Sequence, residues 1–321
     1  MRPFYLLSLF LWISLFLPLA AHGQGKNESF SSLSVEQGLS SVTISAIHKD
    51  SKGYLWVGTE DGLNRYNGYE FKIYRNDPSD EHTLLTNRIL SIFEDSSGTL
   101  WVSTAKGTLH RYNRELDTFI RIPEFNNLVI NDIREDSERR VWFVGTTIKS
   151  LNLSDNSWTD HTGNFKGRLS IIGIEQIHKS DFWVAADTAL YKWNRKTGNL
   201  KVYAHDPKDS NSLGYNYLYS IAKDDIGNLW IATRGGGLDK LDVKSSKFTH
   251  YRTSENRENG PLVNVVRTVC PDGNYIWAGT ENGGLSRLDI RTNKFEHHVA
   301  DKDHPKSISD NSIKALYKDN E

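Results

Sequence analysis

The sequence predicts an all-β fold: a β-propeller of four-stranded blades, with six blades marked by tryptophan and parts of a seventh. An apolar or aromatic residue followed by Trp recurs six times, and successive tryptophans are 45, 41, 41, 47 and 47 residues apart. A period of this length is typical of a propeller blade. Around each Trp, apolar and polar residues alternate in short stretches that end in turn residues, which indicates strands with one buried face. The six tryptophans are Trp56, Trp101, Trp142, Trp183, Trp230 and Trp277.

A signal peptide is predicted before the first blade. Residues 4–20 are apolar, they follow Arg2, and small residues lead up to Gly23. This order is typical of a secretory signal cleaved after Gly23, although a run of this length is also near what an uncleaved membrane anchor needs. The sequence therefore predicts a signal peptide over residues 1–23 and an exported propeller over residues 24–321.

Each repeat divides into four predicted strands. The first alternates and ends near an Asp, the second carries the Trp, the third reads like GLNRYN, and the fourth is short and aromatic. In most repeats a small residue stands two positions after the Trp, where it would let neighbouring sheets pack closely. Blade three has Val144 there and Gly145 next, which indicates a bulge. The predicted blades span residues 39–75, 84–122, 126–160, 168–204, 213–252 and 262–299.

The two ends of the chain predict an incomplete seventh blade. Residues 28–34 resemble an outer fourth strand, and residues 307–321 resemble a first strand with no Trp strand after it. Both segments in one blade would close the ring through the N-terminal strand. We therefore expect a truncated seven-bladed propeller whose two missing strands would follow Glu321. A six-bladed ring with trailing ends is the alternative.

Composition excludes several classes of site. The chain carries 39 basic and 40 acidic residues, so no strongly basic face is implied and nucleic acid is a poor candidate partner. The single Cys270 excludes a disulfide scaffold and a multi-cysteine metal centre. The adjacent His297 and His298 would point to opposite faces of a strand, which is a poor arrangement for one metal. No metal and no cofactor are expected.

Residues that recur in every blade are interpreted as structural, and no catalytic residue is assigned. The run Gly235–Gly237 lacks the following Lys-Ser/Thr of a phosphate loop and predicts a tight turn. The repeat tryptophans predict packing between blades, not platforms for sugars. An Asp recurs six residues before four of them and predicts hydrogen bonds to turn N–H groups, not a catalytic carboxylate pair. These are Asp50, Asp95, Asp136 and Asp224.

Candidate ligand-binding residues are those that break the repeat in loops. We expect the loops between second and third strands, and those between blades, to open on one face. There Arg234 and Lys106 replace acidic or small residues, and Tyr215, Tyr217 and Tyr219 cluster before blade five. Arg and Tyr side chains can hydrogen-bond and stack against sugars. The alternative for each is an ordinary solvated loop side chain.

Three sequence features carry a resemblance to a known family. They are the opening LSVEQGLSSVTISAIHKDSKGYLWVGTEDGLNRYNGYEF, the later GNLWIATRGGGLDKLD, and the Asp-Pro loops NDPSDEHTLL and HDPKDSNSL. With these, the chain resembles the two-component regulator propeller repeats in the periplasmic sensor regions of hybrid two-component histidine kinases of Bacteroidetes. The resemblance covers about residues 30–318. Blades three and four depart from it, since they lack the Gly-Gly-Leu segment and the Asp-Pro loop.

The resemblance implies a role in signalling. Members of this kind place two propellers and a further β domain before a membrane span, a kinase and a regulator, and they are generally associated with glycan sensing. This chain would be a periplasmic propeller, not itself an enzyme, within a parent anchored in the inner membrane. Its candidate partners are an oligosaccharide, the rest of the kinase and a second copy of itself. The alternatives are a spacer or dimerisation propeller whose ligand is recognised by a downstream domain, and a propeller lyase or quinone-dependent dehydrogenase.

Overall fold

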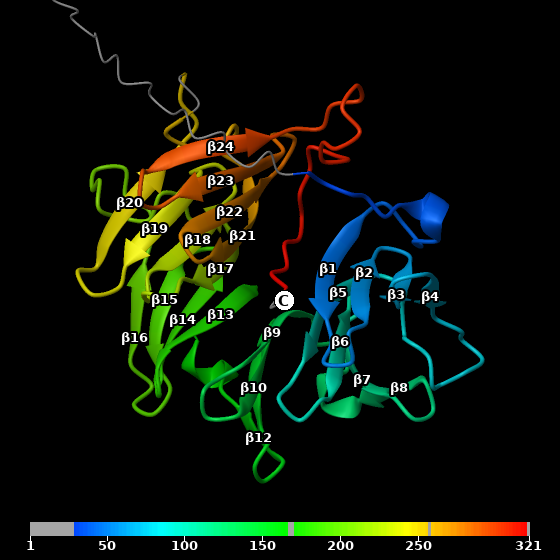
Figure 1. Cartoon of the computed structure of the whole chain (residues 1–321). Coiled ribbons are helices and arrows are strands. Elements are labelled where there is room, and N and C mark those ends of the chain that lie inside the picture. Colours follow the sequence, from blue (N-terminus) through cyan, green and yellow to red (C-terminus); the bar gives the residue numbers. More distant parts are fainter. Residues whose placement is uncertain (1–28, 166–169, 256–257, 320–321) are drawn as a thin grey trace, which may run out of the picture.

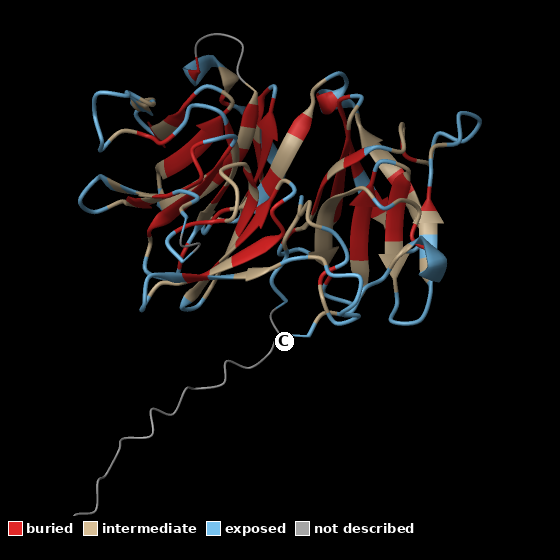
Figure 2. Ribbon diagram, turned by 90° about the horizontal axis from the view of Figure 1, so that it is seen from above, coloured by how far each residue is buried: buried red, intermediate tan, exposed pale blue. Residues whose placement is uncertain are grey.

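Six four-stranded antiparallel sheets surround a central channel in the computed structural model, which describes residues 29–165, 170–255 and 258–319 (Figure 1). Each sheet is a meander in which consecutive strands pair, and the first strands of successive sheets pack against one another in chain order. Buried residues concentrate in the sheets and exposed residues in the loops (Figure 2). The predicted all-β propeller of four-stranded blades is therefore confirmed. The predicted signal peptide, residues 1–23, lies outside the described residues.

The strands follow the predicted blades closely. Blade 1 contains β1 (Ile44–Lys49), β2 (Leu55–Thr59), β3 (Gly62–Tyr66) and β4 (Phe71–Tyr74). Blade 2 contains β5 (Ile89–Glu94), β6 (Leu100–Thr104), β7 (Thr108–Asn113) and β8 (Thr118–Ile122). Blade 3 contains β9 (Ile130–Glu135), β10 (Arg140–Gly145), β11 (Ile148–Asn152) and β12 (Ser157–Asp160).

The second half repeats this plan. Blade 4 contains β13 (Ile171–His178), β14 (Asp181–Ala186), β15 (Leu190–Asn194) and β16 (Leu200–Tyr203). Blade 5 contains β17 (Leu218–Lys223), β18 (Leu229–Thr233), β19 (Leu238–Asp242) and β20 (Lys247–Tyr251). Blade 6 contains β21 (Val266–Asp272), β22 (Tyr275–Thr280), β23 (Leu285–Asp289) and β24 (Lys294–His298). Three short 3₁₀ turns, η1 (Val35–Gln37), η2 (Pro123–Phe125) and η3 (Thr162–Asn164), complete the described elements, and none of these helices has the length and apolar character needed to cross a membrane.

A buried aspartate ties the first turn of four blades to the tryptophan strand. In blade 1, Asp50 Oδ1 accepts hydrogen bonds from the backbone N–H groups of Lys52 and Tyr54, and Oδ2 accepts one from Trp56 Nε1 at 2.8 Å. Burial alone would raise the pKa of Asp50, but the hydrogen bonds from Trp56 and Arg114 outweigh it and lower the pKa. This confirms the predicted structural role of the repeated aspartates. The other pairs are Asp95–Trp101 at 2.7 Å, Asp136–Trp142 at 2.9 Å and Asp224–Trp230 at 2.9 Å.

Blade 4 shows what is lost without the aspartate. Ile177 stands six residues before Trp183, and the register between β13 and β14 shifts between Gln176 and His178. Trp183 Nε1 is buried and, among the described residues, has no hydrogen-bond partner. A buried N–H without an acceptor costs stability, so this blade lacks a contact that stabilises four of the others.

Neighbouring blades meet at the small residue two positions after the tryptophan. A methyl group added to Gly58 would lie 2.6 Å from Ile89 Cγ2 of the next blade, which is too close for two carbon atoms. The position therefore needs a small residue, as predicted from the sequence. A register shift does lie opposite Val144 and Gly145, but the extra residue is Asn131 of β9, so the bulge is not in the tryptophan strand, where it was predicted, and Val144 simply occupies the position of the small residue.

This bulge is not peculiar to blade three, because every first strand carries one near its start. A bulge leaves one residue unpaired and re-aims its side chain. The bulged residues lie at equivalent positions and line the central channel. They are Ser45, Leu90, Asn131, Ile172, Tyr219 and Arg267.

Residues 313–319 lie between blade 6 and blade 1 in the place of a further first strand (Figure 1). The Ile313 N–H donates to Thr280 O at 2.9 Å, and a methyl group on Gly279 would lie 2.7 Å from Ile313 Cγ2, which repeats the contact of Gly58 with the next blade. On the other side, Tyr317 Oη donates to the carbonyl of Lys49 at 3.3 Å. The segment thus bridges the first and last complete blades, although it is not assigned as a strand.

The N-terminal segment makes a looser contact. Residues 29–34 are not in a strand, and the backbone N–H of Phe30 donates to Lys306 O at 3.0 Å. The Phe30 ring also packs edge-on against His298 of blade 6, with 5.1 Å between ring centroids. A complete seventh blade that includes this segment stays a prediction.

Removal of one turn aspartate should destabilise the protein strongly. In Asp224→Ala, the buried Trp230 Nε1 and Asn228 N–H would both lose their acceptor, and each unpaired buried donor costs roughly 1–3 kcal/mol. We expect the free energy of unfolding in a denaturant titration to fall by about 3 kcal/mol. The neighbouring Asp225 is exposed, so Asp225→Ala should change it by less than about 0.5 kcal/mol. Equal losses in both variants would contradict the role given to the buried carboxylate.

Candidate functional site

The turns between second and third strands and the loops between blades open on one face of the propeller, as predicted. In blade 5, Leu218 at the start of β17 pairs with Thr233 at the end of β18. Beyond them, the N–H of Arg234 donates to Tyr217 O at 2.9 Å, so the turn after β18 lies beside the loop that enters β17. We call this side of the molecule the loop face.

Four of the five predicted ligand-binding residues lie together on the loop face of blade 5. The guanidinium of Arg234 stands over the Tyr217 ring, 5.0 Å from its centroid. The rings of Tyr217 and Tyr219 meet edge to face with 5.6 Å between centroids. Tyr215 lies beside the same turn, and its side chain is 43% exposed. The structure therefore assembles Arg234, Tyr215, Tyr217 and Tyr219 into one cluster.

A further arginine extends this cluster into blade 6. The guanidinium of Arg267 stands 4.3 Å from the Tyr219 ring centroid and forms an ion pair with Glu281 at 2.8 Å. Cations and aromatic rings thus alternate in the order Arg234, Tyr217, Tyr219, Arg267. We name these four residues the arginine–tyrosine ladder. Such alternation offers flat apolar surfaces next to strong hydrogen-bond donors.

Glycines allow the close approach that brings Tyr215 to the ladder. A methyl group on Gly236 would lie 2.8 Å from the backbone of Gly214 and 2.9 Å from Tyr215 Cβ. Any larger residue there would push the turn away from the loop. The run Gly235–Gly237 is therefore a tight turn, as predicted, and its small size determines the spacing between Arg234 and the tyrosines.

The buried side chain of Asp239 holds the loop that carries the tyrosines. The N–H of Gly214 donates to Asp239 Oδ2 at 2.6 Å, and His250 Nδ1 lies 2.7 Å from Asp239 Oδ1. The other ring nitrogen of His250 lies 3.1 Å from Ser210 O, so this imidazole contacts the same loop a second time. The Asp239 side chain is fully buried, and its hydrogen bond raises the pKa of His250.

Lys106 does not belong to this cluster. It is exposed in the turn between β6 and β7 of blade 2, whereas the ladder lies in blades 5 and 6. The sequence-based prediction grouped Lys106 with Arg234 because both break the repeat in the same loop. The distance between the two residues depends on the positions of their blades in the folded ring. Arg267 was not predicted as a binding residue. An alignment of the six first strands would have shown it as the one arginine at the bulge position.

Other chemistry-bearing residues lie apart from one another. His297 and His298 pair with consecutive residues of β23, Ser286 and Leu285, so they occupy opposite faces of the strand. Cys270 is half-buried, and burial raises the pKa of its thiol, which disfavours a reactive thiolate. Within residues 29–165, 170–255 and 258–319, no group of three or more His, Cys, Asp or Glu side chains could hold a metal ion.

Comparison with known proteins gives the following similarities. Residues 38–61, 83–106 and 212–235 match the family described as two component regulator propeller. The protein named Histidine kinase P4 from Formosa agariphila is 44% identical over 69 residues, which are 22% of this chain and 5% of the kinase. The chain thus spans only a small part of that relative.

Solved structures share the fold at low sequence identity. The extracellular domain of a putative hybrid two component system from B. thetaiotaomicron superposes with a TM-score of 0.76 at 22% identity, over 91% of this chain and 39% of that one. The extracellular domain of a putative one component system from the same organism gives 0.64 at 21% identity, over 84% and 38%. A virginiamycin B lyase from Staphylococcus aureus gives 0.58 at 16% identity, over 80% and 84%. At these identities the likeness concerns the fold alone.

The ion pair beneath the tyrosine loop should make stability depend on pH. The pKa of His250 is raised in the folded protein, so its stabilising effect is complete below the unfolded value of about 6.5 and is lost as pH rises through the folded pKa. In His250→Gln this part of the pH dependence should vanish, as measured by the thermal unfolding midpoint between about pH 6 and pH 8. His82→Gln, at an exposed histidine, should keep the wild-type profile. A profile unchanged in His250→Gln would contradict the assignment.

Proposed function

We propose that this chain is a propeller of the two-component regulator type, that it is the periplasmic, ligand-sensing part of a hybrid two-component sensor, and that it responds to glycan-derived oligosaccharides. Several similarities support the proposal. The family match lies in three of the repeats, one relative is named a histidine kinase, and two structural relatives are extracellular domains of regulatory systems. The predicted signal peptide agrees with export.

The observation that carries the proposal is the arginine–tyrosine ladder. Exposed aromatic rings stack on the apolar faces of sugar rings, and guanidinium groups donate several hydrogen bonds to hydroxyls or carboxylates. Tyr217 is 38% exposed and Tyr215 43%, so both rings are accessible at the loop face. In the equivalent position of blade 6, Arg234 is replaced by Glu281, which shows that the repeat itself does not require a cation there.

The proposed mechanism is a shift between arrangements of domains. The blades form a rigid frame, so a ligand on the loop face can also contact whatever domain faces it. A ligand that binds one arrangement more tightly than another increases the population of that arrangement. A kinase across the membrane would respond to this shift. The chain itself is proposed to carry no catalytic activity, and the likeness to a lyase is a likeness of fold.

The test is direct binding to the full-length protein. We would titrate it with short oligosaccharides prepared from neutral and from uronic-acid polysaccharides and measure heat of binding and kinase autophosphorylation in parallel. At least one oligosaccharide should bind saturably and change autophosphorylation, and Arg234→Ala should weaken that binding by about tenfold, since a charge-assisted hydrogen bond is worth about 1.5–3 kcal/mol.

Arg111→Ala is the matched control. Arg111 is exposed in β7 of blade 2 and lies outside the ladder, so its loss should leave affinity unchanged. Oligosaccharide binding that is equally tight in wild type, Arg234→Ala and Tyr217→Ala would overturn the assigned site. It would favour a spacer or dimerisation propeller whose ligand is recognised by a downstream domain.

A further inference from the structure

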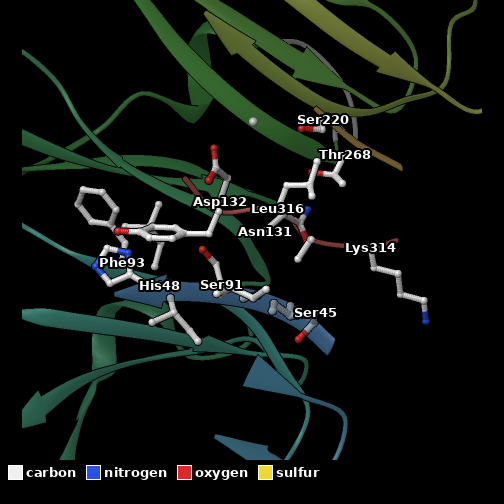
Figure 3. Close-up of a pocket in the computed structure, with 18 of the residues that line it drawn as sticks. Ser45, His48, Ser91, Phe93, Asn131, Asp132, Ser220, Thr268, Lys314 and Leu316 are labelled. Carbon is white, nitrogen blue, oxygen red and sulfur yellow. The ribbon is translucent and has the colours of Figure 1, made fainter. Parts of the chain in front are cut away.

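The central channel contains a chamber that adjoins the ladder, since Tyr219 and Arg267 belong to both, whereas Arg234 and Tyr217 do not line the chamber. Its volume is about 450 Å³, and its walls are the six first strands together with residues 314–318 (Figure 3). Cavities of roughly 300–1,000 Å³ are typical of small-molecule sites. Residues 314–318, between blades 6 and 1, form the remaining part of the wall.

Equivalent positions of the first strands form three tiers along the channel. The uppermost tier consists of the bulged residues, among them Tyr219 and Arg267. In the lowest tier, larger side chains line the chamber from blades 1 to 3 and from the closing segment (residues 314–318), namely His48, Phe93, Arg134 and Tyr317. The middle tier is built of small residues, which is why space remains there. Its members are Ala46, Ser91, Asp132, Gly173, Ser220, Thr268 and Ala315.

Asp132 is the exception in the middle tier. Every other member is Ala, Ser, Gly or Thr, so Asp132 is the one acidic residue of this tier. Arg134 Nε lies 3.2 Å from each carboxylate oxygen of Asp132, so the carboxylate is charge-paired and held in position from the tier below. Its side chain is 18% exposed, and it lines the chamber. Repeat packing needs no charge at this position, since five other blades do without one.

The remaining groups of the chamber suit a molecule with many hydroxyls. Ser220 and Thr268 carry hydroxyls at the same level as Asp132, and Figure 3 shows these side chains around the chamber. Asn131 uses its amide N–H to bond Ile171 O at 2.7 Å, which fixes the side chain and leaves its Oδ1 as an acceptor. Carboxylate, amide and hydroxyl groups together can both accept and donate hydrogen bonds.

Aromatic rings form the floor on one side. The His48 ring meets Tyr317 edge to face with 5.5 Å between centroids and lies 6.0 Å from Phe93. Burial lowers the pKa of His48, although Glu94 and Asp50 act in the opposite direction, so this imidazole is neutral near pH 7. A neutral aromatic floor below polar walls matches the two kinds of surface that a sugar ring presents.

We propose that this chamber binds a single sugar unit, with ring hydroxyls hydrogen-bonded to Asp132 and its polar neighbours and the apolar ring face against the aromatic floor. A metal ion fits less well, because Arg134 interacts with both nearby carboxylates, Asp132 and Glu175, and because no group of three or more ligating side chains occurs among the described residues. The chamber shares Tyr219 and Arg267 with the ladder, but Asp132 belongs only to the chamber and Arg234 only to the ladder, so variants at these two residues distinguish the sites.

The experiment uses the full-length protein and three monosaccharides, D-glucose, D-galactose and D-glucuronate, each titrated to millimolar concentration in a calorimeter. At least one should bind saturably with one site per chain. Asp132→Asn, which keeps the shape of the side chain, should weaken this binding at least about tenfold, because a hydrogen bond to a charged group is worth about 1.5–3 kcal/mol. Asp303→Asn, at an exposed loop residue, is the matched control and should leave it unchanged.

Two variants that fill the chamber give a second, independent test. Ala315→Leu adds bulk from the closing segment, and Ser220→Leu adds it from blade 5, so failure of one variant to fold leaves the other. Each folded variant should lose monosaccharide binding while it keeps binding oligosaccharides at the ladder. The proposal is wrong if none of the three sugars binds saturably, or if binding survives in Asp132→Asn and in the folded chamber-filling variant. Monosaccharide binding that is lost in Arg234→Ala alone would also overturn it, because it would place the sugar on the loop face.

Discussion

Each blade of this propeller depends on the next one to cover its tryptophan face. Trp56 is completely buried because blade 2 packs over it, with Tyr112 edge-on at 5.0 Å between ring centroids. The small residue two positions later lets the next first strand approach, as Ile89 does at Gly58. At the last complete blade Ile313 takes that place, but Trp277 stays only half-buried, because residues 313–319 cover less than a whole sheet would.

This dependence explains both candidate binding regions. Residues on the covered blade faces are constrained by packing, whereas residues in the loops and the channel can be replaced without loss of the fold. Binding residues can therefore arise in these two regions. On the loop face, the turn after β18 carries Arg234 to the tyrosines. In the channel, the bulges turn side chains inward, and the small middle tier leaves room around Asp132. In both regions the informative residues are those that differ from their equivalents in other blades.

The fold could be predicted from the sequence because the same residue types recur in most repeats and make the same contacts there. The turn aspartates bond the tryptophan rings as predicted, and Gly58 and Gly279 admit the next first strand, whereas the bulge expected at Val144 lies on β9 and recurs in every blade. The orphaned Trp183 Nε1 is consistent with the irregularity of blade 4. The sequence could not show how close residues from different loops and blades lie in the folded ring. Tyr217 and Arg234 are close because a turn and a loop share one edge of blade 5.

The same limit explains why sequence reasoning could not separate Lys106 from the cluster and why it missed other residues. Lys106 resembles Arg234 in its local pattern but lies in blade 2, away from the tyrosines. Arg267 reaches Tyr219 only because first strands of neighbouring blades pack together. Asp132 stands out only when the first strands are placed side by side in a channel. Contacts between repeats depend on curvature and bulges, which local patterns do not reveal.

Hydrogen exchange on the full-length protein, with and without a saturating oligosaccharide, tests the central claim most directly. If the propeller itself receives the ligand, amide exchange should slow in residues 213–219 and 233–237, which form the loop and turn around the ladder. If exchange slows only outside residues 29–319, the ligand is recognised elsewhere and the propeller is not the sensor.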